Sequence, residues 1–174
     1  LGEKTGIDLP AESRGLLPTV AYYDKRFGKD KWPRGVLLNL GIGQGEILAT
    51  PLQLALMTCV AANGGRPVRP HVVEKVANDP TYKVDKPTEP GVQDTPEHWE
   101  TLHEAMRLVV DAGTAAGARL PGVKVGGKTG TAQNPHGQDH ALFVCFAPVD
   151  TPRIAMAIVA ENSGHGGSVC APIA

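Results

Sequence analysis

Residues 141–147 and 154–160 form two continuous apolar runs, and they are the clearest elements that the chain predicts. Both runs are apolar on both alternating faces, which is typical of strands that lie centrally in a sheet covered on both sides. The connection at 148–152 is short, so we expect the two strands to pair antiparallel. A third strand signal begins at Val123, which predicts a three-stranded meander over residues 123–160.

A helix with few polar positions is predicted over residues 50–63. Thr50 can cap its start, Pro51 occupies the first helical position, and Gln53 completes a capping box. The helix is apolar on nearly every face, which indicates burial in a larger domain rather than a place on the surface. Its length is well below the ~20 residues that a membrane span needs.

A second helix is predicted over residues 95–112, and it is amphipathic. Its apolar residues recur at spacings of three, four and three along the chain: Trp99, Leu102, Met106 and Val109. Helices precede the strands, and an apparent helix follows them. This order predicts an α+β fold, an antiparallel sheet flanked by helices.

The remaining segments contain many turn-forming residues. Residues 1–35 carry repeated glycines and prolines, which predicts an ordered, loop-rich segment laid over a core. Gly41, Gly43 and Gly45 predict a tight turn into the first helix, because the stretch lacks the Lys-Ser/Thr of a phosphate-binding loop. Residues 66–94 mix short strand signals with prolines, which predicts a hairpin followed by an irregular, exposed connection.

Composition excludes some classes of function. The chain has 17 basic and 18 acidic residues, a net charge of −1, so we expect no nucleic-acid partner. No apolar run reaches the ~20 residues of a membrane span, and no signal peptide is recognisable. The sequence has no initiator methionine and stops shortly after Pro172, so we expect it to be a piece of a longer protein.

Neither a metal site nor a cofactor site is expected. The cysteines lie among apolar or small residues without metal-site spacing, so buried free thiols are expected at Cys59, Cys145 and Cys170. His98 and His103 are too far apart to share a helical face. His136 and His140 lie in a stretch with proline and glycine that is typical of a loop, so neither pair forms a zinc motif.

The candidate chemistry lies in the triplet Lys128-Thr129-Gly130, at the start of the predicted meander. A lysine, hydroxyls and a strand position without a side chain suit a site that binds an anion and a carbonyl. Gly130 lets a ligand approach the main chain, where neighbouring N–H groups can face a developing oxyanion. For the triplet alone a simple turn is the alternative, and the second copy at residues 4–6 is interpreted as one.

Taken together, the motifs resemble the transpeptidase domains of penicillin-binding proteins, most closely the class B, elongation-type (penicillin-binding protein 2-like) members. The segments that carry the resemblance keep the family's order along the chain: residues 5–15, 43–55, 62–65, 127–133, 139–143 and 146–148. The family has three active-site motifs, S-x-x-K, S-D-N and K-T-G. Of these three, this sequence contains only the third.

The resemblance implies a serine β-lactamase/transpeptidase-like fold that is incomplete here, with residues 1–174 forming the C-terminal part of one transpeptidase domain. The nucleophilic serine would lie outside the chain, so the parent protein would be the enzyme and this chain alone would be inactive. The parent would cross-link peptidoglycan. Its serine would attack the penultimate D-Ala carbonyl of a stem peptide, release the terminal D-Ala and pass the acyl group to a second stem's amine.

The resemblance also assigns roles to residues of the triplet and its surroundings. Lys128 would be the electropositive element of the proton-transfer and carboxylate-binding network. Thr129 and Thr131, beside Gly130, would hydrogen-bond the carboxylate of a substrate or β-lactam, and the Thr131 N–H would be one oxyanion donor. Two further residues are expected at the rim of the cleft: Gln133 and His165.

One point of geometry stays open at this level. Strict alternation places Lys128 and Gly130 on one face of the strand, and Thr129 and Thr131 on the other. A bulge at residues 126–127 would bring both sets toward one cleft. A plain glycine-rich connection is the alternative for the segment that contains His165.

The implied partners are peptidoglycan stem peptides, β-lactam antibiotics, the N-terminal remainder of the same domain and cell-elongation membrane proteins. The domain would work on the periplasmic face of the inner membrane, held by an N-terminal anchor absent from this sequence. Two alternatives keep the fold, a penicillin-sensing or otherwise non-catalytic binding module and a serine β-lactamase. An unrelated α+β binding domain is the third, because a fold class alone fixes no function.

Overall fold

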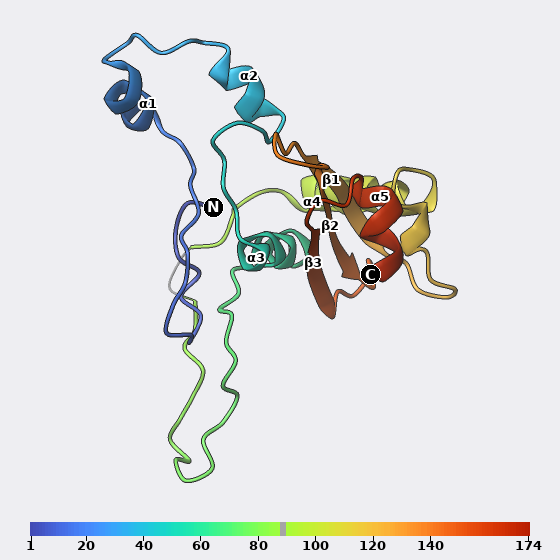
Figure 1. The fold of residues 1–174 in the computed structure, drawn as a ribbon. Coiled ribbons are helices and arrows are strands. Elements are labelled where there is room, and N and C mark those ends of the chain that lie inside the picture. The colour runs from blue at the N-terminus through green and yellow to red at the C-terminus, as the bar shows by residue number, and fades with distance from the viewer. Residues whose placement is uncertain (88–89) are drawn as a thin grey trace.

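A computed structural model describes residues 1–87 and 90–174, and helices pack around a three-stranded antiparallel sheet (Figure 1). The strands, in spatial order, are β1 (Gly126–Ala132), β2 (His140–Ala147) and β3 (Ile154–Ala160). The helices are α1 (Val20–Phe27), α2 (Val36–Gly41), α3 (Pro51–Ala62), α4 (Pro96–Asp111) and α5 (Gly166–Val169), with 3-10 turns η1 (Ala116–Ala118) and η2 (Ala171–Ile173). The predicted α+β fold, an antiparallel sheet flanked by helices, is confirmed. In the part of the chain just given, no helix has both the length and the apolar character to cross a membrane.

The position of β3 differs from the prediction. Within the described residues β2 is the central strand, whereas β3 pairs with β2 alone and lies at an edge of the sheet. Apolar residues on both faces had indicated a central place for both strands. That pattern reflects contacts made above and below the sheet, which an edge strand also makes, and it carries no information about neighbours along the strand's edges.

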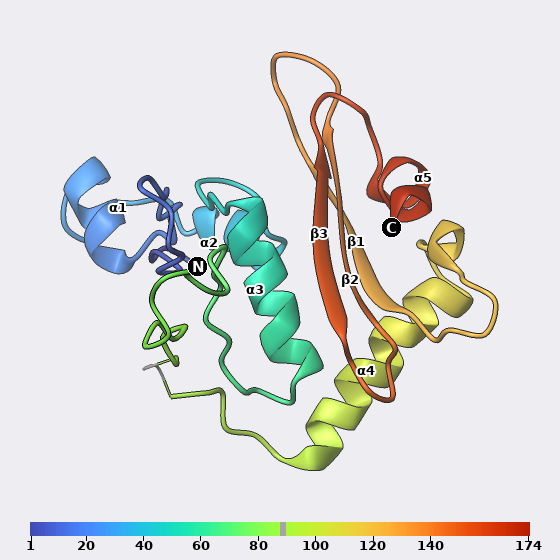
Figure 2. The same ribbon diagram turned by 90° about the horizontal axis from the view of Figure 1, so that it is seen from below.

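Alternate side chains of β2 enter two separate cores, one on each face of the sheet. Phe143 lies in the larger core, which also contains residues from the C-terminal end of the chain. Phe146 points to the opposite face and packs with Ala62 at the end of α3. Both phenylalanines are only 1% exposed, and burial of each contributes roughly 1.5–3 kcal/mol. Figure 2 shows α3 on one side of the sheet and α5 on the other.

The start of α3 is held by the capping box that the sequence predicts. The Thr50 hydroxyl accepts a hydrogen bond from the Gln53 N–H at 3.1 Å, and the Gln53 side-chain oxygen accepts one from the Thr50 N–H at 2.9 Å. The Gln53 amide then donates to the carbonyls of Glu3 and Arg14, at 2.7 and 2.9 Å. One buried glutamine therefore caps the helix and fastens the N-terminal segment to it.

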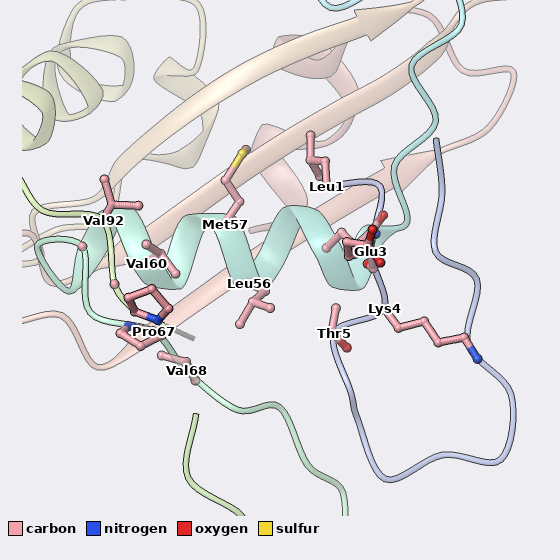
Figure 3. Close-up of a pocket in the computed structure, with 14 residues that line it drawn as sticks. Leu1, Glu3, Lys4, Thr5, Leu56, Met57, Val60, Pro67, Val68 and Val92 are labelled. Atoms are coloured by element: carbon pink, nitrogen blue, oxygen red, sulfur yellow. Dashed lines mark hydrogen bonds between the residues drawn. The ribbon is translucent and has the colours of Figure 1, made fainter. Parts of the chain in front are cut away.

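The prediction that α3 is buried on nearly every face holds for one side of the helix only. Its inner side packs against β3 and β2, but Met57 on another side is 48% exposed. The outer side lines a groove of about 600 Å³ together with Gly65, residues 67–68, residues 90–92 and the N-terminal segment (Figure 3). Within the described residues, the sheet covers only one of the apolar faces of α3.

Helix α4 crosses one end of the sheet and joins the two cores. Its His103 ring donates from Nε2 to the carbonyl of Ala61 at 2.8 Å and lies 5.2 Å from the ring of Phe146. Two helical turns further on, Val110 is buried in the core on the opposite face. Of the predicted amphipathic face, Met106 packs against the Phe146 core and Val109 against the core on the opposite side, whereas Leu102 is 38% exposed.

The loop-rich interpretation of residues 1–35 missed helix α1. The helix has eight residues, and the Thr19 hydroxyl caps it by accepting from the Tyr22 N–H at 3.2 Å. Its buried Tyr23 stacks on Trp32 with ring centroids 5.5 Å apart. Contacts with a later part of the chain therefore help to stabilise α1. A local signal was also present, since Tyr23 and Phe27 are four residues apart and their rings stack with centroids 6.3 Å apart.

Residues 66–94 do not form the predicted hairpin ladder. The described part of this segment has two extended legs that run away from the sheet (Figure 1), and its only pairing is an isolated bridge between Val76 and Asp79. Residues 88–89, which fall within the predicted connection, lie outside the described residues. One leg is anchored by Asp8, whose carboxylate accepts hydrogen bonds from the N–H groups of Val72 and Val73 at 2.7 and 2.9 Å. These bonds, with that from Val73 first, lower the pKa of Asp8.

Replacing Thr50 with alanine tests the capping box at α3. Loss of the Thr50 hydroxyl leaves the Gln53 N–H without its acceptor, so we expect the free energy of unfolding to fall by about 1 kcal/mol. Thr95 is the matched control, because it precedes α4 without a side-chain capping hydrogen bond to a backbone N–H of the helix. Urea denaturation followed by circular dichroism measures both variants, and equal losses for the two would contradict this account.

Candidate functional site

Strand β1 carries the Lys-Thr-Gly triplet in an uninterrupted ladder. Its residues pair one to one with β2, from Gly126 opposite Phe146 to Ala132 opposite His140. The bulge considered for residues 126–127 is therefore absent, and strict alternation holds. Lys128 lies on the face covered by α3, whereas Thr129 lies on the face covered by α5 and the C-terminal residues.

The lysine and the threonines nevertheless reach the same edge of the sheet. The side chain of Lys128 is exposed and folds over the strand so that its ammonium donates to the carbonyl of Thr129 at 2.7 Å. The four-carbon stem of lysine makes this reach possible. The charge of Lys128 thus lies at the edge of β1, although its Cβ belongs to the opposite face from the threonine hydroxyls.

The outer edge of β1 presents main-chain groups as well. The carbonyl of Thr131 accepts a hydrogen bond from the side-chain amide of Gln44 at 3.0 Å, from outside the sheet. In an antiparallel strand the N–H and C=O of one residue project to the same side. The N–H of Thr131 therefore points out from the same edge, near the Lys128 ammonium.

The two threonine hydroxyls have different partners. Thr129 Oγ1 lies 2.7 Å from the hydroxyl of Thr114, which follows α4. Thr131 Oγ1 lies 3.4 Å from Nδ1 of His165, the residue that precedes α5. The structure thus brings His165 to Thr131, whereas Gln133 lies exposed just beyond the end of β1.

The first residues of α5 fit against the sheet only because they are glycines. A Cβ at Gly166 would overlap the carbonyl oxygens of Leu142 and Gly130, and one at Gly167 would overlap the carbonyl oxygen of Thr114. The backbone of α5 therefore touches the backbone of β1 and β2 directly. This contact fixes His165 above the strand, in the glycine-rich connection that the sequence predicts.

The β1–β2 connection and the connection from β3 to α5 lie at the same end of the sheet (Figure 2) and are tied together by hydrogen bonds. The Asn134 side chain donates to that of Asn162 at 2.6 Å. The Asp139 carbonyl accepts from the N–H groups of Ser163 and Gly164 at 3.0 and 2.8 Å. The β1–β2 connection therefore sets the path of the chain just before His165.

Two site residues were not singled out from the sequence. Gln44 belongs to the predicted tight turn, and its neighbours Gly43 and Gly45 have φ values of 75° and 81°. A polar residue between two glycines is a signal from which a role for Gln44 could have been inferred. Thr114 has no comparable signal, because only the packing of α4 brings it to Thr129.

The other candidate positions do not form sites. The second Lys-Thr-Gly copy is a loop closed on Glu12, whose carboxylate accepts from the N–H groups of Thr5 and Gly6 at 2.6 and 3.1 Å. Desolvation is the largest single effect on the pKa of Glu12 and raises it, but hydrogen bonds from the Thr5 side chain and from these two N–H groups together outweigh it, so the pKa is lowered. In residues 1–87 and 90–174, no three His, Cys, Asp or Glu side chains are grouped so that they could hold a metal ion.

Comparison with known proteins identifies the family. The family described as penicillin binding protein transpeptidase domain matches residues 1–174. The chain belongs to this family. The peptidoglycan D,D-transpeptidase MrdA of Acinetobacter baumannii is 41% identical to it over 184 residues, which cover 96% of the chain and 27% of that protein. MrdA of Escherichia coli K12 is 35% identical over 189 residues, which cover 97% of the chain and 30% of that protein.

Solved structures of the same family superimpose on most of the chain. The crystal structure of Pseudomonas aeruginosa PBP2 in complex with WCK 5153 has a TM-score of 0.87 and 40% identity, over 99% of this chain and 39% of that one. The complex of PBP2 and MreC from Helicobacter pylori has a TM-score of 0.79 and 32% identity, over 99% of this chain and 31% of that one. The resemblance to penicillin-binding protein 2-like members is confirmed. The chain spans less than a third of the length of the two curated relatives.

Replacing Gly166 with alanine tests the close contact between α5 and the sheet. The added Cβ overlaps backbone oxygens that cannot move aside, so we expect a loss of about 1–3 kcal/mol in the free energy of unfolding. Gly41 is the matched control, because a Cβ there meets nothing within 4 Å. Thermal denaturation compares the variants, and an unchanged melting temperature for Gly166→Ala would contradict the described packing.

Proposed function

We propose that residues 1–174 are the C-terminal part of the transpeptidase domain of a peptidoglycan D,D-transpeptidase. The observation that carries the proposal is the family match over the whole chain, together with 41% identity to a D,D-transpeptidase. The sequence contains the K-T-G motif but neither S-x-x-K nor S-D-N. In this proposal the nucleophilic serine is supplied by residues outside this sequence.

The proposed reaction is acyl transfer through a serine acyl-enzyme. The serine attacks the penultimate D-Ala carbonyl of one stem peptide, the C–N bond to the terminal D-Ala breaks, and that D-Ala leaves. The amine of a second stem peptide then attacks the ester and regenerates the serine. The N–H of Thr131, which projects from the edge of β1, is one donor to the oxyanion formed in both steps.

The edge of β1 also suits the carboxylate that stem peptides and penicillins share. The Lys128 ammonium lies at this edge and supplies positive charge for the carboxylate and for proton transfer at the serine. The Thr131 hydroxyl provides a hydrogen bond, and Gly130 keeps the approach to the strand open. Thr129 stands beside them with its hydroxyl already on Thr114, and the remaining rim residues are Gln133 and His165.

The cellular setting is part of the same proposal. Peptidoglycan lies outside the cytoplasm, so the domain works on the periplasmic face of the inner membrane, in synthesis that sets cell shape. A homologous PBP2 from Helicobacter pylori has been solved in complex with MreC. We therefore propose that the protein that contains this chain also assembles with cell-elongation membrane proteins.

Lys128→Ala in the full-length protein tests the proposed site. We expect the rate constant for acylation by a fluorescent penicillin to fall about 10²-fold or more, because the change removes charge stabilisation at the reacting centre. Lys124→Ala is the matched control, since Lys124 forms an exposed ion pair with Asp150 at 3.1 Å, just before β1.

Three results would contradict parts of the proposal. Undiminished acylation of Lys128→Ala would remove Lys128 from the site. Rapid hydrolysis of the penicillin by the unchanged protein would indicate a β-lactamase. Stable acylation without cross-linking of stem peptides would indicate a sensing module.

A further inference from the structure

Thr131 is held from two sides by segments that are distant in the sequence. Gln44, 87 residues earlier, donates to its main-chain carbonyl at 3.0 Å. His165, 34 residues later, places Nδ1 at 3.4 Å from its hydroxyl. Gln44 lies in a turn between two glycines with positive φ, and His165 precedes the closely packed Gly166.

The partner of the Thr131 hydroxyl decides what that hydroxyl can do for an anion. A hydroxyl has one proton and two lone pairs, and a carboxylate only accepts hydrogen bonds. If the imidazole accepted the Thr131 proton, that proton would be unavailable to a ligand. If the imidazole donates from Nδ1–H, a lone pair of Oγ1 is used and the proton remains free to point away from His165. A chain of two such bonds also polarises the outer one.

The hydroxyl of the neighbouring Thr129 has a closer partner than that of Thr131. The Thr129 hydroxyl is 2.7 Å from the Thr114 hydroxyl, a short bond that engages one of the two protons available to the pair. The Thr131 hydroxyl has a longer contact with an exposed ring. Of the two hydroxyls on this face of β1, that of Thr131 is therefore the better placed to turn toward a ligand.

We infer that His165 and Gln44 are positioning residues for Thr131, with separate tasks. His165 donates from Nδ1–H to the Thr131 hydroxyl and thereby directs its proton to the carboxylate of the ligand, so it favours ligands with a free carboxylate. Gln44 holds the main-chain edge of β1 and thereby keeps the Thr131 N–H aimed at the oxyanion. This inference rests on the proposed transpeptidase function and goes beyond the assignment of His165 to the rim.

The two tasks predict different patterns of loss in the full-length protein. The measurement is the second-order rate constant for acylation by a penicillin with a free carboxylate and by its methyl ester. We expect His165→Ala to slow the reaction with the acid about tenfold and to leave the ester nearly unchanged. His165→Asn keeps a donor at the place of Nδ1 and should restore most of the rate with the acid.

Gln44→Leu should instead slow both compounds to a similar extent, about tenfold, because oxyanion stabilisation does not depend on the carboxylate. The matched controls are His136→Ala and Gln138→Leu, which alter exposed residues of the β1–β2 connection. Melting temperatures of all variants show whether any loss of rate follows a loss of folding.

Four results would overturn the inference. Equal losses for acid and ester in His165→Ala, or no recovery in His165→Asn, would reduce His165 to a structural role. Unchanged rates in Gln44→Leu would remove Gln44 from the oxyanion edge. If the unchanged protein is not acylated by the acid at all, the proposed function itself fails and this inference fails with it. If the wild-type protein is acylated but the His165→Ala variant loses the same rate with acid and ester, only this inference fails and the proposed function stands.

Discussion

The backbone of α5 touches the backbone of β1 and β2, and the arrangement of the site depends on this contact. No side chain fits at Gly166 or Gly167, because the space is already filled by carbonyl oxygens of Leu142, Gly130 and Thr114. The contact continues into the core, where the buried Cys170 thiol donates to the Ala141 carbonyl at 3.3 Å. The contact therefore fixes the start of α5, and the residue just before it, His165, lies beside the Thr131 hydroxyl.

The chemistry gathers at an edge of the sheet rather than on one of its faces. A regular ladder separates the Cβ atoms of Lys128 and Thr131 by face, and no bulge removes that separation. The edge unites them, because the long lysine side chain bends over the strand while the main-chain groups of Thr131 project outward. The alternation of side chains along a strand predicts only the face to which each Cβ belongs. It does not predict that a long side chain can bend over the edge of the strand, or that main-chain groups project from that edge.

Local signals account for the elements that the sequence predicts. The apolar runs of β2 and β3, and the capping box of α3, are properties of consecutive residues, and the structure has elements at those places. The place of Thr114 could not be predicted, because it depends on contacts between distant segments. Helix α1 has a local signal, the Thr19 cap, which the loop-rich prediction did not use. The edge position of β3 was hidden for a related reason, since its apolar residues record the layers above and below it.

Helix α1 supports the site although it lies away from the sheet (Figure 1). Its Tyr23 hydroxyl donates to the Glu46 carboxylate at 2.9 Å, and desolvation together with this bond raises the pKa of Tyr23. Glu46 follows Gln44 by two residues, and the Gln44 N–H donates to the Asn39 carbonyl in α2 at 2.8 Å. The turn that presents Gln44 to β1 is thus held at both of its ends. Helix α2 binds the Gln44 N–H, and helix α1 binds Glu46, which follows the turn. The segment least visible in the sequence pattern therefore helps to fix the main chain of Thr131.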